Sequence, residues 1–117
     1  MTDIFELHAD ICRALASAAR LRIIALLRYG EMPVGEIVEA LQGRKANVSQ
    51  HLAVMRQRGI VQARREGMNV YYRLTSPKVI EACELMREVL QEQIASRGEL
   101  VAAHESGGIA SGKGMRL

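Results

Sequence analysis

Residues 34–59 read VGEIVEALQGRKANVSQHLAVMRQRG, and the order of apolar and polar residues in this stretch decides the fold. Ile37 and Leu41 stand four residues apart, which is the spacing of the buried side of a short helix. A turn containing Gly43 follows, and a second helix is predicted over residues 45–58. Two helices joined by a short, glycine-containing turn are typical of a helix-turn-helix unit.

The second helix of this unit has one apolar side. Val48, Leu52 and Met55 recur at spacings of four and three residues, so we expect these side chains to face the core. The polar residues between them then face outward, and Gly59 ends the helix. No residue that caps a helix well stands at its start. Since the chain has three tyrosines, one phenylalanine and no tryptophan, the core is expected to be aliphatic.

Two more helices are predicted before this unit. The first covers residues 4–15, where apolar residues return every three or four positions. Ser17 is placed to cap the second, over residues 18–29, and Gly30 to end it. Residues 32–34 form a short extended piece, because the residue before a proline avoids the helical region.

The periodicity changes after the helix-turn-helix. Residues 60–65 and 70–75 are rich in strand-forming residues, and a four-residue loop at 66–69 joins them into a hairpin. The Ser-Pro pair at 76–77 opens a last helix, whose apolar stripe continues to about residue 97. This order of elements predicts a mainly α-helical, α+β fold: a winged helix-turn-helix with the hairpin as its wing.

The length and composition indicate one domain. A chain of 117 residues and 12.9 kDa suffices for a core, which we expect over residues 1–104, with a flexible, glycine- and serine-rich tail over 105–117. The apolar fraction of 49% and the charged fraction of 25% exclude wholesale disorder. No apolar run approaches the ~20 residues that span a bilayer, and acidic residues stand where a signal peptide carries basic ones. The sequence therefore predicts a cytoplasmic protein with no membrane partner.

The positive charge is concentrated in one segment. Residues 44–73 hold seven basic residues and one acidic residue, a formal charge of +6, whereas the rest of the chain carries −3. The basic residues are Arg44, Lys45, Arg56, Arg58, Arg64, Arg65 and Arg73. A basic segment on a mildly acidic body is typical of a surface that contacts nucleic acid. The alternative is a solvated basic face without a partner.

The sequence resembles the ArsR/SmtB family of small bacterial transcriptional repressors over about residues 5–95. The matching stretches are ALASAARLRI at 14–23, PVGEI at 33–37, VSQHLAVMR at 48–56, GIV at 59–61 and RREGMNVYYRL at 64–74. The combination of the VSQHL helix and the following wing is the specific part of this resemblance.

The resemblance implies a homodimer that occupies a palindromic operator in double-stranded DNA and blocks transcription until an inducer arrives. Residues 45–58 would be the recognition helix and residues 61–74 the wing. Residues 4–15 and 79–94 would build the dimer interface, which fits their apolar stripes.

The recognition helix and the wing supply the candidate DNA contacts. A recognition helix reads bases from its N-terminal half, where Asn, Gln and Ser side chains can bond to base edges. Basic residues at the helix start and the hairpin suit phosphates or the minor groove. The predicted contacts are Arg44, Lys45, Asn47, Ser49, Gln50, His51, Arg56, Arg64, Arg65 and Arg73. One alternative is that they are solvent-facing polar residues, and another is that Arg56 and Arg58 pair with acidic residues of the body.

Two cysteines are the candidate sensor residues. Metal-sensing members of the family often carry a CxC-type motif on the helix just before the recognition helix, or paired Asp/His and His/Glu ligands on the last helix. Here residues 34–41 hold no cysteine, and residues 76–97 hold no histidine. Cys12 and Cys83 remain, on the first and last helices, with His8 one turn before Cys12. Three interpretations stay open: buried packing, a dithiol switch, and a thiophilic metal or metalloid site with His8. A regulator without an inducer site is a fourth.

Two other classes of protein are weaker alternatives. The sequence holds no glycine-rich phosphate loop, no GxSxG motif and no HExxH motif, so we expect neither catalysis nor a cofactor. A winged helix that has lost DNA binding and binds a protein instead is the other class. The charge of the basic segment argues against it.

Overall fold

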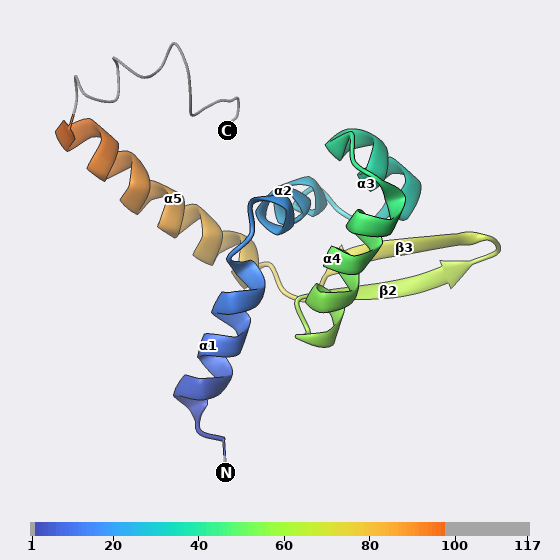
Figure 1. Cartoon of the computed structure of the whole chain (residues 1–117), viewed down its shortest axis with the longest axis horizontal. Coiled ribbons are helices and arrows are strands. Elements are labelled where there is room, and N and C mark those ends of the chain that lie inside the picture. The colour runs from blue at the N-terminus through green and yellow to red at the C-terminus, as the bar shows by residue number, and fades with distance from the viewer. Residues whose placement is uncertain (1, 98–117) are drawn as a thin grey trace. The chain divides into compact units, whose positions relative to one another are not determined.

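The computed structural model describes residues 2–97, so the predicted tail at 105–117 lies outside the described residues. Five helices and three strands follow one another along this part of the chain (Figure 1). They are α1 (Ile4–Leu15), α2 (Ala18–Leu27), β1 (Met32–Pro33), α3 (Val34–Leu41), α4 (Lys45–Gln57), β2 (Val61–Glu66), β3 (Asn69–Leu74) and α5 (Lys78–Arg97). The predicted winged helix-turn-helix is confirmed, with α3 and α4 as the helix pair and β2–β3 as the wing.

The chain divides into two units. Residues 1–83 hold α1 to α4, the sheet and the first turns of α5, and residues 84–117 hold the rest of α5. No helix within residues 2–97 is long and apolar enough to cross a membrane. The helix-turn-helix and the wing both belong to the first unit, which is described first.

The core of the first unit is aliphatic and lies between α2, α3, α4 and the sheet. Its largest fully buried side chains are Ile23, Ile24, Ile37, Leu52, Met55 and Val61. The prediction that Val48, Leu52 and Met55 face inward is confirmed, because each is at most 3% exposed. Burial of this side of α4 fixes which residues of the helix remain outside.

The helix ends follow from local chemistry. Asp3 and Glu6 form a capping box at the start of α1, and Ser17 accepts a hydrogen bond from the Arg20 N–H at the start of α2. Helix α2 ends at Leu27, two residues before its predicted end, and Gly30 follows with a φ of 128°. At α4 no side chain caps the helix start, as the sequence predicts.

The sheet contains one strand more than the predicted hairpin. Strand β1, predicted only as an extended piece, pairs with β3 through Met32–Tyr72 and Pro33–Tyr71, which gives the antiparallel order β1-β3-β2. The predicted four-residue loop is wrong, because Glu66 pairs with Asn69 and only two residues remain in the turn. Gly67 takes the positive φ of 64° that the first position of such a tight turn needs.

Candidate nucleic-acid interface

Helix α4 presents its polar side outward. Asn47 and Gln50 are exposed, and Ser49 and His51 are half-buried, while the opposite side of the helix lies in the core. Asn47, Gln50, His51 and Val54 stand at the spacing of a single helical face. Among the predicted contacts in the N-terminal half of α4, Asn47, Gln50 and His51 therefore share one face, and Ser49 lies off it.

This face borders a shallow hollow of about 330 Å³. Asn47, Gln50, His51 and Val54 of α4 line it, together with Arg20 of α2. The amide and imidazole groups of this lining can hydrogen-bond base edges, and the apolar Val54 can contact a thymine methyl group. The sequence did not identify Arg20 as a site residue, although it lies in the matched stretch at 14–23.

The start of α4 is an open, basic helix end. Arg44 and Lys45 are exposed there, and the absence of a side-chain cap leaves the first backbone N–H groups of α4 available. Such an end attracts phosphate through these N–H groups and the helix dipole. At the other end of the helix, Arg56 is exposed, and Arg58 forms an ion pair with Asp10 of α1 at 3.7 Å. Pairing with the body, the alternative left open for both arginines, is thus observed for Arg58.

The three wing arginines do not lie on the same face of the sheet. Tyr72, Leu74 and Val61 pack against the core, so the residues that alternate with them face away from it. Arg64 and Arg73 belong to this outer face. Arg65 follows the opposite alternation and pairs with Val70 near the turn. The three arginines, all of them predicted contacts, therefore lie on two different faces of the sheet.

Arg64 is held by two carboxylates and a ring. Its guanidinium donates hydrogen bonds of 2.7–3.0 Å to both carboxylate oxygens of Glu31 and one of 2.7 Å to Glu66. It also lies 4.6 Å from the centre of the Tyr71 ring. The hydrogen bonds from Arg64 lower the pKa of Glu31, and the carboxylates raise the pKa of Arg64. The sequence missed Glu31, which lies outside the basic segment and reaches the wing only through the pairing of β1 with β3.

Replacing Glu31 with glutamine is expected to tighten DNA binding. The carboxylate occupies donor groups of Arg64 that a phosphate needs, so its neutralisation frees one phosphate contact. The slope of log K against log salt should then steepen by about 0.9. Anisotropy titrations over a range of salt concentrations measure this slope.

The matched control is Glu39→Gln on α3, which removes the same charge at another exposed position. Equal effects of the two variants would contradict a specific role of Glu31.

The lowered pKa of Glu31 also makes the ion pair stabilise the fold at pH values above the ordinary carboxyl range. This contribution is lost as the pH falls through the lowered pKa.

The two cysteines differ in their surroundings. Cys83 lies partly buried against the core, whereas Cys12 is exposed on α1. In the single chain Cys12 is therefore not a buried packing group, and its burial in a dimer stays a prediction. Among residues 2–97, no three His, Cys, Asp or Glu side chains come together as metal ligands. One copy of the chain thus does not assemble a metal site from Cys12, Cys83 and His8.

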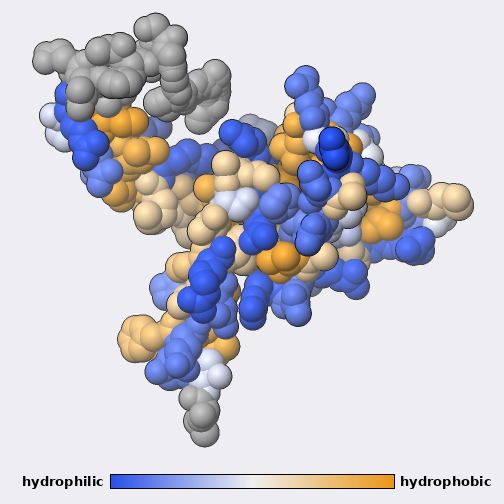
Figure 2. All heavy atoms as spheres, viewed as in Figure 1, coloured by the Kyte–Doolittle hydropathy of each residue, from blue (hydrophilic) through white to orange (hydrophobic). Residues whose placement is uncertain are grey.

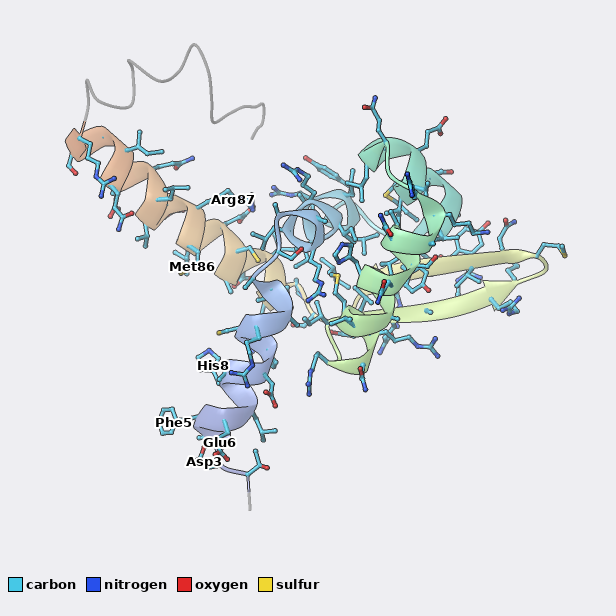
Figure 3. The ribbon with its side chains drawn as sticks, in the orientation of Figure 1. Asp3, Phe5, Glu6, His8, Met86 and Arg87 are labelled. Atoms are coloured by element: carbon cyan, nitrogen blue, oxygen red, sulfur yellow. The ribbon has the colours of Figure 1, made fainter. Side chains whose placement is uncertain are left out.

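Each unit carries an exposed apolar surface. On α1 these residues include Phe5, which is 78% exposed and points outward, and His8 lies on the same helix (Figure 3). In the second unit, α5 exposes Leu85, Met86, Val89 and Leu90. Figure 2 shows apolar side chains at the surface of both helices. Such surfaces in a small domain are typical of an interface with a partner.

Comparison with known proteins gives one family and several relatives. Residues 17–63 match the family described as bacterial regulatory protein, arsR family. Rv0081 of Mycobacterium tuberculosis, an uncharacterized HTH-type transcriptional regulator, is 33% identical over 109 residues, which are 92% of this chain and 96% of that protein. Its crystal structure covers 83% of this chain and 98% of its own, with a TM-score of 0.74.

Two further relatives carry descriptions of function. HlyU of Vibrio cholerae, named a transcriptional activator, is 35% identical over 68% of this chain and 73% of that protein. A homodimeric winged helix-turn-helix DNA-binding domain of Mycobacterium bovis, described as a possible ArsR-family transcriptional regulator, is 32% identical. Its solution structure covers 80% of this chain and 91% of its own, with a TM-score of 0.71.

Proposed function

Because the chain belongs to the ArsR family of bacterial regulatory proteins, we propose that it is a homodimeric repressor that occludes a palindromic operator. At the family level it is a DNA-binding transcriptional regulator with a winged helix-turn-helix, and not an enzyme. The proposed partners are double-stranded operator DNA and a second copy of the chain. The proposed place of action is the cytoplasm.

The observation that carries this proposal is the outer face of α4. Asn47 and Gln50 stand exposed beside the hollow, one turn from the basic, uncapped start of the helix. Amides that read bases and a helix end that holds a phosphate are the two kinds of contact that a recognition helix combines. The proposed contact set is Arg44, Lys45, Asn47, Ser49, Gln50, His51, Arg56, Arg64, Arg65 and Arg73, with Arg64 requiring release from Glu31.

The proposed dimer rests on the apolar surfaces of α1 and α5. Phe5 and Met86 are each about two-thirds exposed or more in the single chain, which favours burial by a partner. The homodimeric domain of Mycobacterium bovis supports the same assembly. A dimer sets the distance between its two α4 helices, and half-sites one turn of DNA apart require about 34–36 Å.

We place the signal at the thiols. Cys12 is exposed on α1, within the proposed interface, and Cys83 lies at the edge of the core. Peroxide oxidises two such thiols to a disulfide and is itself reduced to two water molecules, and a bridge would change how the helices pack. A metal or metalloid site completed by the second copy, and a regulator without an inducer, are the alternatives.

A titration of the DNA upstream of the protein's own gene tests the proposal. Reduced protein should bind tightly, and peroxide should weaken binding about tenfold, a usual size for coupling between two sites. Cys12→Ser and Cys83→Ser should resist the oxidant, and dithiothreitol should restore wild-type binding. Unchanged binding after peroxide would contradict the thiol signal.

A reporter gene behind the same DNA tests the direction of regulation. Expression should fall when the protein is present, because a bound dimer excludes polymerase from the promoter. A rise in expression would overturn repression and favour activation, the role that the name of the Vibrio cholerae relative gives to that protein.

A further inference from the structure

A hydrogen bond joins α2 to the outward face of α4. Arg20 Nε donates to His51 Nδ1 at 3.1 Å, and the Arg20 Nη1 group donates to the carbonyl oxygen of Ala14 at 3.2 Å. Arg20 and His51 are both partly buried, and both line the hollow beside Asn47 and Gln50. The arginine is thus anchored on the protein at two points.

This bond determines where the imidazole proton sits. A guanidinium remains protonated in proteins and can only donate hydrogen bonds, so the nitrogen that it faces must be an unprotonated acceptor. The neutral ring of His51 therefore carries its proton on Nε2. A proton on Nδ1 would set an N–H group against the Arg20 N–H group, so only a ring without a proton on Nδ1 can make this bond.

We propose that Arg20 is a positioning residue for DNA binding, which holds His51 as a neutral Nε2–H donor on the face of α4. This inference rests on the proposed function, in which α4 contacts DNA. A fixed N–H donor can hydrogen-bond only to an acceptor atom. On DNA such an atom is a phosphate oxygen or, in the major groove, N7 or O6 of guanine, N7 of adenine or O4 of thymine. An unfixed ring, in contrast, would offer a donor or an acceptor to each base.

The first arm of the test needs no DNA. Nitrogen-15 NMR of the imidazole should show His51 in the Nε2–H form in the wild-type protein. In Arg20→Met, which keeps the length of the side chain and removes the donors, it should show a mixture of both forms. Arg22→Met on the same helix is the matched control, since Arg22 is exposed, and it should leave the spectrum unchanged. A wild-type ring protonated on Nδ1 would overturn the proposal even if DNA binding is as proposed.

The second arm measures operator binding. Arg20→Met should weaken it about three- to tenfold, the size of one hydrogen bond, with Arg22→Met as the control for the lost charge. In a His51→Ala background the same substitution should have no further effect, because Arg20 acts through His51. An equal loss in both backgrounds would overturn the proposal and make Arg20 itself a DNA contact.

The choice of DNA identifies the acceptor. A loss by Arg20→Met on operator DNA alone supports a base-edge partner of His51, and an equal loss on random DNA supports a phosphate.

Thermal unfolding of each variant accompanies the titrations, because Arg20 also donates a hydrogen bond to the carbonyl oxygen of Ala14. Failure of the wild-type protein to bind any DNA would instead overturn the proposed function, and the NMR arm would still decide the state of the ring.

Discussion

Replacing Gln50 with alanine is expected to weaken operator binding by about 1–3 kcal/mol, which is about fivefold to more than a hundredfold. Gln50 is exposed on α4 and lines the hollow beside Asn47, where its amide can donate to and accept from the edge of one adenine. Random DNA should lose much less affinity, because phosphate contacts supply most of that binding. Anisotropy titrations on the operator and on a scrambled duplex of equal composition measure both affinities.

Gln57 provides the matched control for this substitution. It is the same type of residue, exposed at the last position of α4, far along the helix from the half that reads bases. Gln57→Ala should leave operator binding close to wild type. The base-reading role of Gln50 would be contradicted if Gln50→Ala lost equal affinity for operator and scrambled DNA. It would also be contradicted if Gln57→Ala lost as much operator affinity as Gln50→Ala.

Replacing Leu90 with glutamate is expected to abolish the dimer and, with it, most operator binding. Leu90 is half exposed on α5 in the single chain, and burying a carboxylate among the apolar side chains of the proposed interface is costly. A monomer holds one half-site at a time and loses the effective concentration that links the two, so affinity should fall by about 10²-fold or more. Sedimentation equilibrium reports the assembly, and the titration above reports the binding.

The neighbouring substitution Gln91→Glu introduces the same charge at an exposed polar position of α5. It should retain both the dimer and operator binding. Circular dichroism should show equal helix content in the two variants, so that unfolding does not account for the loss. A wild-type chain that sediments as a monomer, or a Leu90→Glu chain that stays dimeric, would refute an interface through this part of α5.

The helices of this fold could be predicted from local spacing alone. Val48, Leu52 and Met55 are all buried because one helix period fixes which side of α4 is apolar. The hairpin turn was misjudged because the last pair, Glu66 with Asn69, forms across strands and leaves no trace in the order of residues. The pairing of β1 with β3 joins segments about 40 residues apart, and for the same reason it could not be read from the sequence.

In the candidate site, too, residues placed by one helix could be predicted, whereas residues placed by contacts between elements could not. Asn47 and Gln50 were found because their place on a predicted helix determines that they face outward. Arg20 and Glu31 were missed because each reaches the site from another part of the chain. Arg20 does so through its hydrogen bond to His51, and Glu31 through its ion pair with Arg64. A further signal was available for the wing, because alternation along a strand places Arg64 and Arg65 on opposite faces.

The direct junction of β1 with α3 has a mechanical consequence. Strand β1 ends at Pro33 and α3 begins at Val34, so no slack chain separates the sheet from the helix-turn-helix. Pro33, with its ring-fixed φ of −72°, stiffens this joint further. We therefore expect the wing and α3 to move together, because β1 pairs with the wing and is joined to α3 without a linker. In the proposed dimer, we expect an inducing signal to change the angle or distance between two such units, each carrying its α3 and its wing together.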